Sequence, residues 1–149
     1  MSESIAGTHR DFAGSPPRSE IISSSPVRQA YQLLHFAFVA APLIAGADKF
    51  LHLLVNWDIY LAPVIARLSP IGGHGLMLVI GVVEIIAGLL VAFKPRIGAY
   101  VVAFWLWGII INLLLVPGYF DVALRDFGLS LGALALARLS TYQPNETNG

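Results

Sequence analysis

The sequence contains no cysteine and very little charge. Without a thiol, the chain can form no disulfide, thiolate metal site or iron–sulfur cluster, and it holds no cysteine nucleophile. Only 12% of the 149 residues are charged, and nine Lys and Arg residues balance nine Asp and Glu residues. Because this composition gives no basic surface for phosphate groups, the sequence predicts no nucleic-acid partner.

Apolar residues are correspondingly abundant in the sequence. They make up 56% of the chain, and the mean hydropathy is +0.73, well outside the range of soluble proteins. About 20 apolar residues in a helix cross the hydrocarbon core of a bilayer. Four apolar segments approach or exceed this length, so we predict an all-α fold, a four-helix transmembrane bundle with spans at about 31–55, 76–93, 98–116 and 122–139.

The segments outside these spans are polar or mixed. Residues 1–29 are rich in Ser, Gly and Pro, and they predict a flexible cytoplasmic N-terminal tail, while residues 141–149 predict a cytoplasmic C-terminal tail. The longest connection, residues 56–75, mixes aromatic and aliphatic residues with two charges between Trp57 and Leu68. This mixture predicts an amphipathic interfacial segment between helices 1 and 2.

The distribution of basic residues predicts the orientation. Six flank the side that holds both termini and three flank the other side: Arg10, Arg18, Arg28, Lys94, Arg96 and Arg138 against Lys49, Arg67 and Arg125. Because cytoplasmic flanks carry the excess of Lys and Arg, we expect a multi-pass protein of the inner (plasma) membrane with both termini in the cytoplasm.

Glu84 is the most informative residue, because it lies halfway along the second span. A charge at that depth costs roughly 2.5–3.5 kcal/mol, which the surrounding apolar residues offset, so the helix still inserts and its carboxyl must face the bundle. Gly81 and Gly88 share this face and predict close helix contacts. Gly128 with Gly132, and Gly108 with Asn112, predict further contacts. A structural hydrogen bond and a functional role remain equal alternatives for Glu84.

A second group of charges lies near the outer ends of the first and fourth spans. Asp48, Lys49 and His52 close the first span, and Arg125 and Asp126 open the fourth. These side chains predict one polar network beneath the connection, with Arg67 as a cover; the alternative is that they are interfacial anchors reaching water. The candidate functional polar cluster is therefore Glu84, Asp48, Lys49, His52, Arg125, Asp126 and Asn112, and no catalytic residue is assigned.

The histidines raise the question of a metal or haem. A site built from His52, His74 and Asp48 is geometrically allowed, but the chain has no ExxH or HExxH spacing, and a lone membrane histidine usually serves as a hydrogen-bonding group. The sequence therefore predicts no metal site.

Several short motifs resemble the DoxX-like family of small four-helix membrane proteins. They are the end of the first helix, Ala45 to Phe50; the pattern Gly81 to Leu90; the basic turn Lys94-Pro95-Arg96 before Gly98-Ala99; and the fourth helix, Arg125 to Gly132. Together they cover residues 30–139, although the connection around Trp57 to Leu68 is longer than in compact members. The resemblance implies a subunit or companion of a quinone-linked oxidoreductase or stress-response system, with quinone as the cofactor and another membrane protein as partner.

Two alternatives to this function stay open. The first is a non-catalytic scaffold or assembly factor, whose polar residues fix helix packing or dock another membrane protein. The second is a small proton-coupled transporter that uses Glu84 and Asn112 along a polar path. A transporter of four helices would need a homodimer to enclose its pathway.

Overall fold

The computed structural model describes residues 25–142, and all of the regular structure within this range is helical. Four helices are long: α2 (Ser25–Leu51), α4 (Gly72–Phe93), α5 (Pro95–Leu114) and α6 (Phe120–Leu139). The connection between α2 and α4 contains the 3-10 helix η1 (Trp57–Tyr60) and the short helix α3 (Pro63–Leu68). The prediction of an all-helical fold is confirmed.

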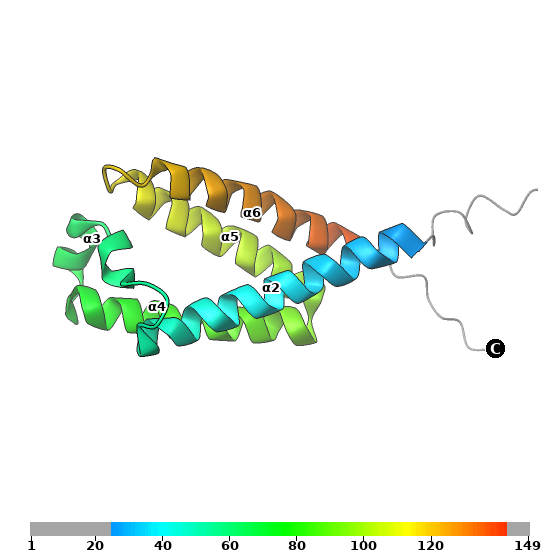
Figure 1. Ribbon diagram of the computed structural model, residues 1–149, viewed down its shortest axis with the longest axis horizontal. Helices are drawn as coiled ribbons and strands as arrows, with labels where there is room; N and C mark the ends of the chain where they lie inside the picture. Colours follow the sequence, from blue (N-terminus) through cyan, green and yellow to red (C-terminus); the bar gives the residue numbers. More distant parts are fainter. Residues whose placement is uncertain (1–24, 143–149) are drawn as a thin grey trace, which may run out of the picture.

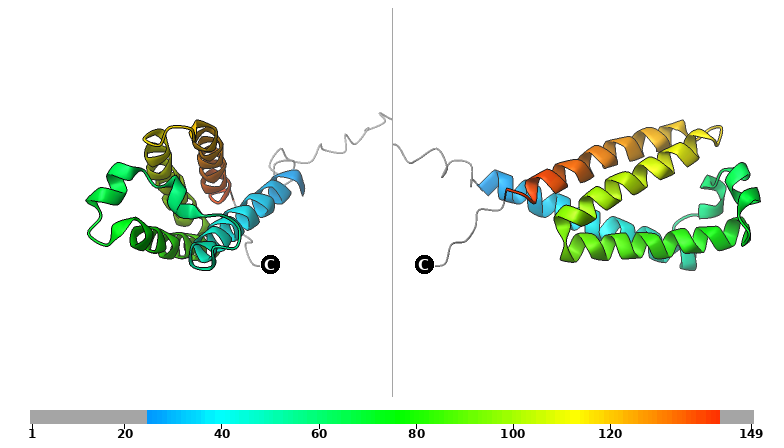
Figure 2. Two further views of the ribbon diagram at one scale, coloured as in Figure 1. Left: turned by 60° about the vertical axis from the view of Figure 1, so that its left-hand side comes forward. Right: turned by 180° about the vertical axis from the view of Figure 1, so that it is seen from behind.

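The long helices form two pairs, α2 with α4 and α5 with α6 (Figure 1). The pairs meet where α4 turns into α5 and move apart toward the opposite end, where the η1–α3 connection lies between them (Figure 2). The start of α2 and the end of α6 lie at the same end of the molecule. This is the arrangement that an even number of antiparallel passes produces.

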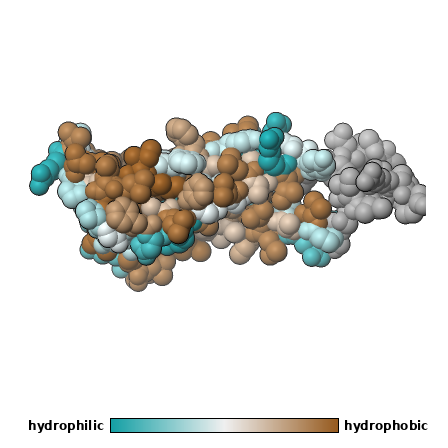
Figure 3. Space-filling view, turned by 90° about the horizontal axis from the view of Figure 1, so that it is seen from above, coloured by the Kyte–Doolittle hydropathy of each residue, from teal (hydrophilic) through white to brown (hydrophobic). Residues whose placement is uncertain are grey.

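Three of the long helices are long and apolar enough to cross a membrane: Pro26–Leu51 within α2, α4 and α5. The fourth, α6, has 20 residues but carries four charges, Asp121, Arg125, Asp126 and Arg138. The face shown in Figure 3 is largely apolar, and large side chains such as Phe93 and Phe104 are more than 80% exposed. An apolar exterior around a partly polar interior suits lipid as the surrounding solvent.

The ends of α2 differ from the predicted span. The helix begins at Ser25, so residues 25–29 are helical and were not predicted to be; Pro26 in the first turn has the fixed φ that suits a helix start. The helix ends at Leu51, four residues before the predicted end, because His52 adopts a left-handed φ of 53°. The rest of the predicted N-terminal tail, and residues 143–149 of the C-terminal tail, lie outside the described residues.

The close contact between α2 and α4 depends on glycine. A Cβ on Gly46 would lie 2.6 Å from the carbonyl oxygen of Gly81, and one on Gly88 would lie 2.9 Å from Cγ of Leu43. The predicted packing role of Gly81 and Gly88 is therefore confirmed. Gly132 contacts Phe38 as expected. A Cβ on Gly108 or Gly128 would meet nothing within 4 Å, so these two glycines make no such contact within the chain.

A histidine side chain provides a hydrogen bond to a backbone carbonyl at the end of α4. Residue 95 is a proline and has no N–H, so it cannot donate to the carbonyl of Val91, four residues earlier. The Nε2 atom of His35 on α2 lies 3.0 Å from this oxygen and supplies the missing donor. His35, in the N-terminal half of α2, thus has a structural role, because it joins α2 to α4.

Candidate functional site

The centre of the molecule holds a buried ion pair between α2 and α4. Nζ of Lys49 lies 2.6 Å from Oε2 of Glu84, and the two side chains are only 3% and 11% exposed. A Cβ on Gly81 would lie 3.1 Å from Cβ of Lys49, so the lysine starts beside this glycine and extends along α4 to Glu84. The carboxyl of Glu84 faces the bundle as predicted, and its cation comes from the last turn of α2.

Trp57 of η1 covers the ion pair. Nζ of Lys49 lies 3.7 Å from the centre of the Trp57 ring, a distance at which the ring face attracts a cation. The indole N–H of the same residue donates to Oδ2 of Asp48 at 2.7 Å. The connection therefore contributes to the polar interior of the bundle, because Trp57 contacts both Lys49 and Asp48.

Asp48 terminates α2 and organises the chain that follows. Its Oδ1 accepts hydrogen bonds from the backbone N–H groups of Leu53 and Leu54, both at 2.9 Å, and its Oδ2 accepts a longer one from Val55. Non-helical backbone at membrane depth is tolerated only when its polar groups have partners. The carboxylate supplies these partners where α2 ends, so its role is to stabilise the turn.

Asp126 and Trp105 bring α6 and α5 to the same centre. Asp126 is 5% exposed and close enough to Glu84 to act on its carboxylate, while its Oδ1 accepts from Nε of the largely exposed Arg125 at 3.2 Å. The indole N–H of Trp105 also faces Glu84 but is buried without a hydrogen bond of good geometry. We call Lys49, Glu84, Asp126, Trp57 and Trp105 the charged centre.

The predicted network forms only in part. Lys49, Glu84 and Asp126 come together, with Arg125 at the edge, and Asp48 joins through Trp57. The remaining candidates, His52, Arg67 and Asn112, are not part of the charged centre. Arg67 is exposed in α3 and forms no cover over the pair.

Asn112 on α5 holds the connection in place. Its Oδ1 accepts from the backbone N–H of Ala62 at 2.9 Å, and its Nδ2 donates to the carbonyl of Tyr60 at 2.6 Å. Both polar ends of the amide are therefore used to join the η1–α3 segment to α5. This contact spans about 50 residues of sequence and could not be inferred from the spacing of Gly108 and Asn112.

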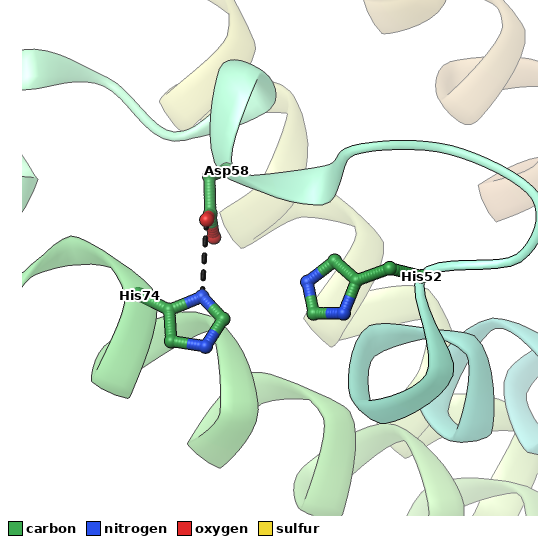
Figure 4. Close-up of side chains that lie close together, drawn as sticks. All are labelled: His52, Asp58 and His74. Atoms are coloured by element: carbon green, nitrogen blue, oxygen red, sulfur yellow. Dashed lines mark hydrogen bonds and ion pairs between the residues drawn. The ribbon is translucent and has the colours of Figure 1, made fainter.

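His52 lies with Asp58 and His74 at the end of the bundle that holds the connection (Figure 4). The sequence offered Asp48 as the acidic neighbour of the two histidines, but its carboxylate caps the end of α2 instead. Asp58 was missed because its place depends on the folding of the connection.

Trp57 and Trp105 are the other residues that sequence reasoning missed. Trp57 was interpreted as an interfacial aromatic, and Trp105 lies within an apolar span without a polar neighbour in the sequence. Comparison with protein-family models, curated proteins and solved structures finds no match to this chain, so the resemblance to the DoxX-like family stays a prediction.

Proposed function

We propose that this chain is a four-span, DoxX-like protein of the inner membrane that serves as a membrane subunit or companion of a quinone-linked redox or stress-response system. In this proposal α6 is the fourth span, the η1–α3 segment lies at the outer interface, and both termini are cytoplasmic. The charged centre is the site that exchanges protons with the quinone.

The observation that carries this proposal is the buried pair of Lys49 and Glu84 with a second buried carboxylate, Asp126, near enough to interact electrostatically with Glu84. Burying an ion pair often stabilises a fold no better than apolar residues of similar volume would. Ionisable residues inside a membrane are costly and commonly mark proton or substrate pathways. Two acids and one base in apolar surroundings supply the proton donors and acceptors that quinone chemistry requires.

The unpartnered N–H of Trp105 adds to this support. A quinone presents two carbonyl oxygens in an apolar ring, and each oxygen needs a hydrogen-bond donor when it leaves water. Within the described residues, the indole N–H of Trp105 is buried beside Glu84 and makes no hydrogen bond of good geometry, so it is available to a carbonyl oxygen of the quinone. Because it lies beside Glu84, a carbonyl bound to it would lie near the Lys49–Glu84 pair, whose ammonium group can donate a proton.

The test measures equilibrium binding of a short-chain benzoquinone to the protein in lipid nanodiscs. We expect Glu84→Gln to weaken binding, since it removes the ionisable carboxyl. A double variant, Lys49→Met with Glu84→Met, removes both charges together and should remain folded while it still fails to bind. Asp121→Asn, an exposed acid in the first turn of α6, is the matched control and should bind normally.

Unchanged quinone affinity in the folded double variant would remove the proposed role. Mass spectrometry of the protein extracted gently from its own membrane provides an independent check, because a retained quinone or an oxidoreductase subunit would identify the system. Recovery of the chain with lipid alone would count against it.

A scaffold or assembly factor is the second candidate, and a specific observation favours it. Asp48, Asn112 and His35 all bond to backbone groups of the same chain, so much of the polar interior is used for structure. This interpretation predicts that the folded double variant, Lys49→Met with Glu84→Met, no longer co-purifies with a membrane partner. A folded double variant that still co-purifies with its partner contradicts it. The transporter alternative has less support, because the amide of Asn112 is fully engaged.

A further inference from the structure

We propose that His52, Asp58 and His74 form a binding site for a divalent transition-metal ion, with Zn²⁺ as the best match to the ligands. The three residues come from separate segments: the residue after α2, the 3-10 helix η1 and the first turn of α4. Their side chains face one another across the end of the bundle (Figure 4). This site is distinct from the charged centre and does not depend on the function proposed for it.

The geometry of the three side chains fits a metal ion. One ligand atom from each residue can be chosen so that all three lie within 4.8 Å of one another. Nδ1 of His74 lies 3.0 Å from Oδ2 of Asp58, and the rings of His52 and His74 stack with centroids 5.5 Å apart. Ligand atoms about 2.0–2.2 Å from a tetrahedral Zn²⁺ are about 3.3–3.6 Å from each other, so small side-chain rotations complete the site.

The ligand set points to the chemistry of the ion. Two imidazoles and one carboxylate are a common set for zinc with three protein ligands, where water or another ligand takes the fourth position. Oxygen-only ions such as Mg²⁺ and Ca²⁺ do not select imidazole, whereas zinc and other transition metals do. Both histidines are exposed, so an ion can reach them from water.

Asp58 provides a second, independent observation that points to a cation. Its Oδ2 contacts His74, but its Oδ1 is buried and has no hydrogen-bond partner in the structure. A buried acceptor without a donor is costly, and a bound cation beside the carboxylate would satisfy it. The backbone of Asp58 is also held in place, because its N–H donates a hydrogen bond to Oδ1 of Asn56 at 3.1 Å.

The neighbouring structure holds the ligands in position without the ion. His52 has a left-handed backbone, a conformation uncommon for residues other than glycine, and the N–H groups of Leu53 and Leu54 that follow it are bound by Asp48. His74 lies on a helix, which fixes its backbone. A metal at this site would join the end of α2, the connection and the start of α4. No single backbone hydrogen bond among the described residues links all three segments.

The experiment measures Zn²⁺ binding by the full chain in nanodiscs, purified without a polyhistidine tag and treated with a chelator. We expect one Zn²⁺ per chain and a rise in melting temperature on its addition. Replacing a residue that only orients a metal ligand typically costs 10–100-fold in affinity, so His52→Ala, His74→Ala and Asp58→Asn should each cost at least about 100-fold. Substitution with Co²⁺ should give the visible absorption of a site with nitrogen and oxygen ligands, and the same variants should remove it.

Matched controls separate this site from general binding. His35→Gln changes a histidine at the other end of α2, and Asp121→Asn removes an exposed acid at the same end of the bundle as the site. Both should bind Zn²⁺ like the unchanged chain. Without metal, the three ligand variants should melt close to the unchanged chain, because the contacts that they lose are largely exposed, and they should not show the rise that Zn²⁺ causes. The proposal would be overturned if the three single variants all bound Zn²⁺ normally. It would also be overturned if a variant carrying His52→Ala, Asp58→Asn and His74→Ala together bound Zn²⁺ as tightly as the unchanged chain.

Discussion

Lys49 and Glu84 lie 35 residues apart in the sequence, and their charged atoms meet at 2.6 Å between α2 and α4. The lysine is near the end of its helix, whereas the glutamate is in the middle of its own. They meet because α4 extends beyond the end of α2, where the connection folds back over the bundle (Figure 1). Because α2 ends two residues after Lys49, the connection can fold back and place Trp57 over the pair.

The first prediction concerns this ion pair. Lys49→Met or Glu84→Gln alone leaves one buried group without its partner, and we expect each to lower the free energy of unfolding by about 3–5 kcal/mol. The double variant with methionine at both positions should recover most of this loss, because no unpaired charge remains. Denaturation of all forms in one detergent completes a double-mutant cycle. Losses that simply add would show that the two side chains are not coupled.

The second prediction uses glycines in contrasting surroundings. Gly46→Ala and Gly81→Ala place a Cβ against backbone oxygen of the facing helix, and overpacking of this kind costs about 1–3 kcal/mol. Gly108→Ala and Gly128→Ala meet nothing within 4 Å, and should be neutral or gain up to about 1 kcal/mol of helix propensity. Thermal unfolding in detergent measures all four. Equal effects at the two kinds of position would contradict the close contact of α2 with α4.

The third prediction concerns Asn112. Replacing it with leucine leaves the N–H of Ala62 and the carbonyl of Tyr60 without partners, at a cost of about 1–3 kcal/mol for each buried group that stays unpaired. We expect faster hydrogen exchange at Ala62 and faster proteolysis between residues 56 and 70, while α4 and α5 keep their protection. Leu114→Ala, at an exposed position on the same helix, is the control. Slow exchange at Ala62 in the Asn112 variant would show that the Asn112 side chain does not hold the connection in place.

The fourth prediction concerns the number of spans. Because the chain has no cysteine, single cysteines can be placed at exposed positions and labelled from either side of the membrane. We expect Pro70→Cys and Pro117→Cys to react from outside, and Arg96→Cys and Thr141→Cys to react from the cytoplasm. The pair at 117 and 141 is decisive for α6, since labelling from the same side would leave only three crossings.

The sequence predicts the long helices well and their connections poorly. The starts of α4, α5 and α6 lie within four residues of the predicted ones, because runs of apolar residues and the prolines or glycines between them are local signals. The end of α2 was placed too late, because Leu53, Leu54 and Val55 continue the apolar pattern while the carboxylate of Asp48 takes their N–H groups. A side chain that competes with a helix for backbone donors leaves no periodic signal.

The sequence predicted that the candidate site contains the buried carboxyl of Glu84, but it did not identify the partner of that carboxyl. A carboxyl in the middle of a span must find a partner, and this physical requirement pointed to Glu84. Its partner was not identifiable, since the depth of Lys49 depends on where α2 ends and how far α4 extends past it. The His52 and Asp58 contacts depend on the fold of the connection in the same way, and only the three-dimensional structure brings them together.

The position of Asp126 also bears on how the chain is built into the bilayer. α6 leaves the ribosome after α2, α4 and α5. Its charged residues oppose its entry into lipid as a single helix, because each charged residue near a helix centre costs roughly 2.5–3.5 kcal/mol. By then α2, α4 and α5 can already surround the Lys49–Glu84 pair, which gives Asp126 a polar interior to enter in place of lipid. Completion of the bundle should therefore be a late, cooperative step of biogenesis, and substitutions at Lys49 or Glu84 should slow the integration of a helix synthesised long after them.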